Sequence, residues 1–119
     1  MQRCFLGSKL HRMVITEADL DYVGSITIDG ELLDISGILP GERVQVADLS
    51  TGTRFETYVL EGPRGSGMIC INGAAARLVN PGDRVIILQY VWVNGDETPP
   101  KPRVVVADDE NLNPELLDL

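Results

Sequence analysis

Cysteine, histidine and aromatic residues are scarce in this chain of 119 residues. Its two cysteines, Cys4 and Cys70, lack CxxC spacing, and His11 is the only histidine that could join them as a ligand. The sequence therefore argues against both a zinc site and a disulfide framework. Neither a GxGxxG nor a Walker motif is present, so the common nucleotide-binding patterns are not matched.

Long apolar runs and an excess of basic residues are also absent. No stretch approaches the ~18 uninterrupted apolar residues of a membrane span, and residues 1–12 lack the apolar centre of a signal peptide. The net charge is −8, of which residues 108–119 contribute −5 and the rest of the chain −3. We therefore expect a cytoplasmic protein without nucleic-acid or membrane partners, with a solvated, mobile acidic tail over 108–119.

The sequence that remains has the features of one small β domain. With 44% hydrophobic residues, the chain can bury a core, and we place a single domain over residues 1–107. Helices are predicted only at residues 16–22, capped by Thr16, and at residues 32–38, ended by Gly37. Alternating or β-branched runs predict strands in VQVADL, RFETYVL, MICI, RVIILQYVWV and RVVVAD. The predicted class is mainly β with a few short helices.

Two segments of the chain are similar to each other. ILPGERVQVADL at residues 38–49 and LVNPGDRVIILQY at residues 78–90 share an apolar lead, a Pro-Gly-acid-Arg-Val sequence and a strand, 41 residues apart. This pattern suggests a small barrel built from two similar β units, although Pro-Gly turns before strands are also common without duplication. The proline-rich stretch NGDETPPKPR at residues 94–103 is predicted to be a surface loop.

Several polar side chains beside the predicted strands could bind a small acidic molecule. Lys9 and His11 alternate onto one strand face, and Arg54 shares a face with Tyr58, whereas Thr57 points to the opposite face. Such cations suit a dicarboxylate, because a guanidinium holds a carboxylate through two parallel hydrogen bonds. Each residue could equally be a solvated or packed strand residue. The NGAAA stretch at residues 72–76 is a turn whose backbone N–H groups could also serve a ligand.

Four motifs together resemble one family. They are GSKLHR at residues 7–12, T-x-ADL-x-YVGS-x-TID at 16–29, RFETY at 54–58 and INGAAARLVNPGDRVII at 71–87. In order and spacing, over about residues 1–90, the chain resembles the pyruvoyl-dependent aspartate 1-decarboxylases. The resemblance implies a six-stranded double-psi β-barrel, a homotetramer with active sites between subunits, and conversion of L-aspartate to β-alanine and carbon dioxide for pantothenate and coenzyme A synthesis.

The resemblance also implies that the chain cuts itself between Gly24 and Ser25. The products would be residues 1–24, the beta chain, and residues 25–119, the alpha chain. The Ser25 hydroxyl attacks the Gly24 carbonyl with Thr57 as a donor to the oxyanion, and elimination from the resulting ester leads to a pyruvoyl group at residue 25. This covalent group forms a Schiff base with the substrate amine and takes the place of pyridoxal phosphate, and no metal is expected.

The same resemblance assigns roles in the pocket. Tyr58 is the proton donor after decarboxylation, and Arg54 and Lys9 bind carboxylates. Tyr22 belongs to a second rank of residues around the pocket. The substrate-binding set implied in this way is Lys9, His11, Arg54, Thr57, Asn72, Gly73, Ala74 and Ala75.

The chain departs from the usual family pattern at Asp21, Ala47 and Arg77, which affects the pocket edge and subunit packing rather than the reacting groups. Two alternatives stay open at this point. One is a double-psi barrel that serves as a binding module, because a fold alone does not fix a function. The other is a pyruvoyl decarboxylase of another amino acid, such as glutamate.

Overall fold

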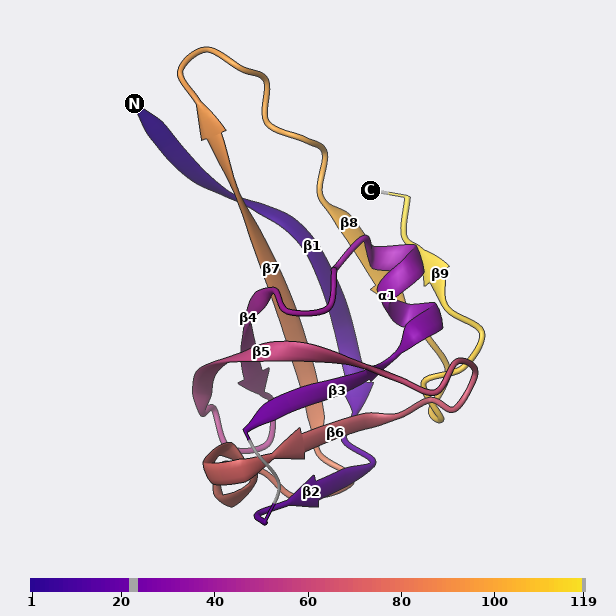
Figure 1. Ribbon diagram of the computed structural model, residues 1–119. Coiled ribbons are helices and arrows are strands. Elements are labelled where there is room, and N and C mark those ends of the chain that lie inside the picture. The colour runs from indigo at the N-terminus through magenta and orange to yellow at the C-terminus, as the bar shows by residue number, and fades with distance from the viewer. Residues whose placement is uncertain (22–23, 119) are drawn as a thin grey trace.

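The structure is a computed structural model that describes residues 1–21 and 24–118. Within these ranges the strands are β1 (Gln2–Val14), β2 (Glu17–Asp19), β3 (Ser25–Asp29), β4 (Arg43–Asp48), β5 (Arg54–Gly62), β6 (Ile69–Asn72), β7 (Arg84–Asn94), β8 (Arg103–Val106) and β9 (Glu115–Leu116). They are joined by hydrogen bonds in the order β2-β6-β3-β5-β4-β7-β1-β8-β9, with one α-helix and one 3₁₀-helix in the described part of the chain (Figure 1). The predicted mainly β class with a few short helices is confirmed. Closure into a six-stranded double-psi barrel, and the domain boundary at residue 107, stay predictions.

The five segments predicted as strands all form strands. Pairing is antiparallel between β1 and β7, β4 and β5, and β4 and β7, whereas β3 runs parallel to β5. The far ends of β1 and β7 extend away from the body, where the proline-rich loop connects β7 to β8 (Figure 1).

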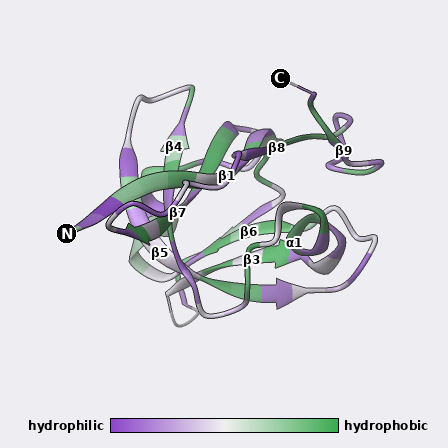
Figure 2. Cartoon of the chain, turned by 90° about the horizontal axis from the view of Figure 1, so that it is seen from above, coloured by the Kyte–Doolittle hydropathy of each residue, from purple (hydrophilic) through white to green (hydrophobic). Residues whose placement is uncertain are grey.

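The hydrophobic core is built mainly from the β-branched side chains of the strands. Figure 2 shows hydrophobic stretches along the middle of the strands and hydrophilic colours in the loops and at the N-terminus. β-Branched side chains suit a pleated surface with one buried face, which explains why these short strands form. The largest fully buried side chains include Leu10, Met13, Ile15, Ile26, Ile28, Leu32, Ile38, Ile69, Ile71 and Ile87.

The helix predicted at residues 32–38 is present as α1 (Gly30–Ser36), two residues earlier in the chain. The Asp29 carboxylate accepts a hydrogen bond from the Glu31 N–H at its N-terminus (2.9 Å). Gly37 ends the helix at φ 79°, a left-handed conformation that favours glycine, and its N–H donates to Leu33 O. No helix in the described part of the chain is long and apolar enough to cross a membrane.

The helix predicted at residues 16–22 is wrong, because residues 17–19 form the short strand β2. β2 runs parallel to β6, with Glu17 opposite Cys70. The Thr16 hydroxyl does not cap a helix but donates to Ile69 O (3.0 Å) and accepts from the Ile69 N–H (3.0 Å). Pairing with a distant strand therefore outweighs the local helix signal, as tertiary contacts often do over weak propensity.

The described part of the acidic tail is attached to the body. Asn111 is 1% exposed, and its side-chain NH₂ donates to Val14 O (2.8 Å) and to Gly67 O (2.8 Å). Farther along, β9 pairs with β8. The solvated, mobile tail expected over residues 108–119 stays a prediction, and the buried Asn111 amide gives this segment one contact with the body.

Candidate active site

Ser25 begins β3 and is fully buried. It lies opposite Asn72 in the antiparallel β3–β6 pair, and Asn72 Nδ2 donates a hydrogen bond to Ser25 Oγ (2.9 Å). A methyl group at Gly24 would lie 3.9 Å from Asn72 O, so the scissile position predicted from the sequence is also beside Asn72. The structure thus brings together three of the predicted residues.

Two residues that the sequence reasoning missed complete this cluster. Asn72 Nδ2 also donates to Thr27 Oγ1 (3.2 Å), and the Cys70 thiol donates to Asn72 Oδ1 (3.2 Å). A signal was available in the sequence, because S-x-T and C-x-N each place two polar side chains on one strand face. We call Ser25, Thr27, Cys70 and Asn72 the Asn72 cluster.

Thr57 and Tyr58 lie on β5, the strand parallel to β3. Ile26 is paired with Val59 in this parallel register. Continuing the register backwards by one and two residues brings Ser25 level with Tyr58 and Gly24 level with Thr57. Burial along β5 alternates, with Tyr58 exposed and Thr57 half-buried, which confirms that the two side chains point to opposite faces.

The predicted Gly73, Ala74 and Ala75 open the 3₁₀-helix η1 (Gly73–Leu78) directly after Asn72. Gly73 has φ 70°, which accounts for glycine at the turn out of β6. Asn72 occupies the N-cap position of η1 without a side-chain capping hydrogen bond. Its side-chain amide donates to Ser25 and Thr27 in the Asn72 cluster instead, so Asn72 belongs both to the cluster and to the start of η1.

The predicted cations lie away from Ser25 within one chain. Lys9 and His11 are on β1, which is separated from β3 by β5, β4 and β7 in the sheet order. Arg54 is exposed and donates to Gln45 Oε1 (3.2 Å), four residues before Tyr58 on β5. Four residues of strand correspond to about 13 Å. The sheet order and the strand spacing therefore place these side chains away from Ser25 along the sheet of one chain.

His11 has an electrostatic environment that disfavours its charged form. Burial is the largest cause that lowers its pKa, and the positive charges of Lys9 and Arg12 lower it further. Its Nδ1 is buried without a hydrogen-bond partner among the described groups. Lys9 and His11 flank the core residue Leu10, in agreement with their predicted common face. Tyr22, the remaining predicted residue, lies outside the described residues.

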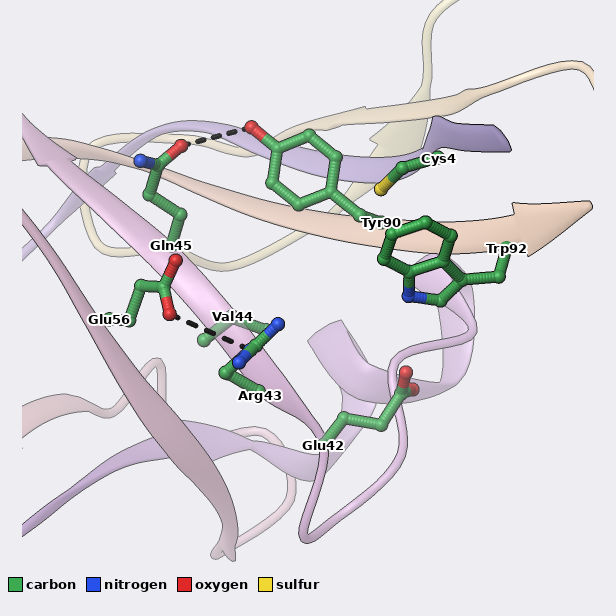
Figure 3. A pocket seen from close by; sticks show the side chains of 8 residues that line it. All are labelled: Cys4, Glu42, Arg43, Val44, Gln45, Glu56, Tyr90 and Trp92. Atoms are coloured by element: carbon green, nitrogen blue, oxygen red, sulfur yellow. Dashed lines mark hydrogen bonds and ion pairs between the residues drawn. The ribbon is translucent and has the colours of Figure 1, made fainter. Parts of the chain in front are cut away.

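A surface hollow of about 460 Å³ lies on the outer face of β4, β5 and β7 (Figure 3). The Tyr90 hydroxyl donates to Gln45 Oε1 (2.9 Å), and Arg43 forms an ion pair with Glu56 (3.6 Å). Trp92 is 63% exposed at its edge. Arg43 is the register partner of Tyr58, so the hollow adjoins a predicted catalytic residue. None of the predicted site residues lines it, and the sequence did not predict it.

Comparison with known proteins gives one consistent result. Residues 1–113 match the family model described as aspartate decarboxylase. A protein of Bacillus subtilis named aspartate 1-decarboxylase is 50% identical over 118 residues, 98% of this chain and 93% of that protein. Proteins with the same name from Pelotomaculum thermopropionicum (56% identical, 89% of this chain, 81% of that protein) and Neisseria meningitidis (54%, 93% and 88%) are also similar.

Proposed function

The chain belongs to the aspartate decarboxylase family, and from that premise we propose that it converts L-aspartate to β-alanine and carbon dioxide. The observation that carries this proposal is the similarity of 50–56% identity over most of the chain to proteins named aspartate 1-decarboxylase. The enzyme is a carboxy-lyase, and its product would supply pantothenate and coenzyme A synthesis in the cytoplasm.

The proposal includes self-cleavage of the chain between Gly24 and Ser25. Ser25 Oγ forms a bond to the Gly24 carbonyl carbon while the C–N bond breaks and the amine receives the hydroxyl proton, which gives an ester. Loss of the Ser25 α-proton then expels the Gly24 carboxylate, and water replaces the enamine nitrogen as ammonia to leave a ketone. The register of β3 and β5 supports a role for Thr57, whose level in the sheet is that of the Gly24 carbonyl.

The residues around Ser25 fit the pyruvoyl group that this cleavage would produce. Asn72 Nδ2 donates to Ser25 Oγ, the oxygen that leaves with Gly24. The ketone forms at the former Cα of residue 25 and the former Cβ becomes its methyl group, so the Asn72 amide would lie beside the pyruvoyl group as a hydrogen-bond donor. A pyruvoyl group supplies a ketone that condenses with an amino group and a carbonyl that accepts the electron pair released with carbon dioxide. Cleavage would also open the buried end of β3, because residue 25 would become a chain end.

The chain's own residues would bind and protonate the substrate. Arg54 and Lys9 would bind carboxylates, with Arg54 providing the two-point contact, and Tyr58 would donate a proton to the α-carbon. The backbone N–H groups of η1 after Asn72, at Gly73 to Ala75, would line the pocket. His11 would contribute as a neutral group, since burial and the neighbouring cations lower its pKa.

A homotetramer with sites between subunits is part of the proposal. Within one chain the cations lie on β1 and at the start of β5, away from Ser25 along the sheet, and a second copy would supply them at a site between subunits. The exposed aromatic side chains Tyr58, Tyr90 and Trp92 give the outer face of β5 and β7 an apolar surface suited to contact between copies.

Intact-mass analysis of the purified protein tests the proposal. We expect two pieces of 24 and 95 residues, with the larger blocked at its N-terminus. Ser25→Ala should remain whole and inactive. Ser66→Ala is a matched control because Gly65-Ser66 is the same dipeptide in an exposed turn, and it should be cut like the parent. A parent chain that stays uncut and inactive would refute the enzyme and favour a binding module.

A further inference from the structure

The Asn72 cluster occupies the face of β3 and β6 that is turned away from the core. Ser25 pairs with Asn72 and Thr27 pairs with Cys70, so the four side chains form two adjacent rows on one face. The residues between them, Ile26 and Ile71 among others, are fully buried in the core. The alternation that builds the core therefore also gathers these four polar side chains.

The orientation of the Asn72 amide depends on its neighbours. An amide has one acceptor end and one donor end, and exchanging the two ends would turn the oxygen toward both hydroxyls. Cys70 offers a thiol proton to Oδ1 at 3.2 Å, and Thr27 offers a hydroxyl oxygen to Nδ2 at 3.2 Å. The thiol donor of Cys70 favours the orientation in which Nδ2 donates to Ser25 Oγ, and Thr27 Oγ1 then accepts the second proton of the same NH₂ group.

The Cys70 thiol keeps the proton that this arrangement needs. Burial is the main cause that raises its pKa to about 11, and the nearby carboxylates of Glu17 and Asp19 raise it further. Glu17, the register partner of Cys70 on β2, is a second acceptor within reach of the thiol, which has only one proton to donate. A thiolate, which would repel Oδ1, is therefore disfavoured at neutral pH.

We propose that Cys70 and Thr27 are positioning residues for self-cleavage, which hold the Asn72 amide so that it fixes Ser25 Oγ next to the Gly24 carbonyl. This inference rests on the proposed function. Both residues contact the Asn72 side chain and act through it. A hydroxyl held in place for attack reacts faster than one that samples several rotamers, because orientation lowers the entropic part of the barrier.

The test is the rate constant of self-cleavage, followed by intact mass after purification of the uncut chain. Cys70→Ala should slow cleavage by about tenfold, the effect of losing one hydrogen bond. Cys70→Ser keeps a donor at the same place and should cleave within about twofold of the parent. Thermal unfolding of both variants separates the two roles, because serine restores the donor without restoring the apolar volume of cysteine.

Thr27→Val and a double-mutant cycle make the test independent of one substitution. Valine keeps the branched shape of threonine and its preference for strands, so the variant should fold and cleave about threefold more slowly. In an Asn72→Ala background, Cys70→Ala should have no further effect on the rate. If Cys70→Ala and Thr27→Val cleave at the parental rate, or if Cys70→Ser is as slow as Cys70→Ala, the inference is wrong. A parent chain that never cleaves would instead overturn the proposed function.

Discussion

The two similar segments at residues 38–49 and 78–90 have the same backbone turn but different side-chain chemistry. In each turn the residue after the glycine donates its N–H to the carbonyl of the residue before the proline, at 3.1 Å in the first and 3.0 Å in the second. Gly41 has φ 89° and Gly82 has φ 93°. Proline followed by a left-handed glycine is typical of a type II turn, so the two segments share a turn type as well as a sequence.

The acidic residue after each glycine also accepts the same hydrogen bond, from the backbone N–H of the residue before the proline. Glu42 Oε1 accepts the Leu39 N–H (2.8 Å), and Asp83 Oδ2 accepts the Asn80 N–H (3.0 Å). In the first segment the second oxygen of Glu42 accepts from Gln89 Nε2 at 3.1 Å. The side-chain amide of Gln89, in the second segment, therefore supplies the hydrogen bond to the remaining oxygen of Glu42 in the first turn.

The equivalent contact in the second segment is between two acids. Asp48 precedes Gln89 by 41 residues, the spacing of the repeat, and it lies beside Asp83. Asp48 is 2% exposed, and no donor reaches its Oδ2 among the described groups. A carboxyl oxygen without a donor is satisfied when it carries a proton itself. We infer that Asp48, in its protonated form, takes the place of the Gln89 amide as a donor.

The pKa directions of the two acids agree with this interpretation. Burial is the largest cause that raises the pKa of Asp48, followed by its hydrogen bond with Asp83, and that same hydrogen bond lowers the pKa of Asp83. The guanidinium of the neighbouring Arg84 turns away, to Arg12 O and to Asp109. Asp48 therefore stabilises the fold at low pH and loses this contribution as pH rises through its raised pKa. Asp83 stabilises the fold above the ordinary carboxyl pKa and loses its contribution as pH falls through its lowered pKa.

Gln89→Glu should have the largest effect, because it converts the first turn into a second acid pair. The substitution removes the donor to Glu42 and places two carboxylates together, so we expect a loss of about 2 kcal/mol in the free energy of unfolding at neutral pH. Urea unfolding across a pH series should show this loss shrinking as the solution is acidified. Gln2→Glu, at an exposed strand end, is the control and should change little. A loss that did not depend on pH would contradict the equivalence of the two contacts.

Gly41→Ala and Gly82→Ala should have smaller and equal effects. No atom lies within 4 Å of the position of an added methyl group at either glycine, so the cost comes from the backbone conformation alone. We expect each variant to lose about 1.5 kcal/mol of stability, which urea unfolding can measure. Clearly unequal losses would show that the two turns also differ in backbone conformation, and not only in the side chains that contact Glu42 and Asp83.

The repeat also shows what could be predicted from the sequence. Proline, glycine and β-branched runs determine local conformation, so the turns and the strands from Val44 onward were predictable. The strand β2 was not, because Thr16 and Glu17 find their partners on β6, more than 50 residues away. The contact between Asp48 and Asp83 was likewise not visible, although the 41-residue spacing could have suggested it.

The candidate site, like the fold, could be predicted only in part from the sequence. Motifs predicted roles for Ser25, Thr57 and Asn72, which stay predictions, and strand alternation correctly separated the faces of Thr57 and Tyr58. Alternation alone could not say that Thr27 and Cys70 share Asn72, since that depends on the register between β3 and β6. Nor could it show that Lys9 is four strands from Ser25 in the sheet order. Register and strand order come from long-range packing, which a local pattern does not contain.

Asp48→Asn should have the smallest effect and the opposite sign. Asn keeps an oxygen to accept the Ser50 and Thr51 N–H groups that Asp48 Oδ1 now binds at 2.7 and 3.2 Å. Its NH₂ group would donate to Asp83 without needing a proton from solution, as Gln89 does to Glu42. We therefore expect a gain of about 1 kcal/mol at pH values above the raised pKa of Asp48, where the parent has lost the shared proton.

The gain should vanish in acid, where the parental Asp48 is protonated and donates equally well. Unfolding midpoints measured across a pH series would show the decline of the parent on the alkaline side and its absence in Asp48→Asn. Asp96→Asn, in the exposed loop after β7, removes the same charge elsewhere and should leave the decline in place. If Asp96→Asn stabilised the protein as much as Asp48→Asn, general charge repulsion rather than a buried proton would explain the pH dependence. In that case the two turns would differ in sequence, but a buried proton on Asp48 would not be what distinguishes the second turn from the first.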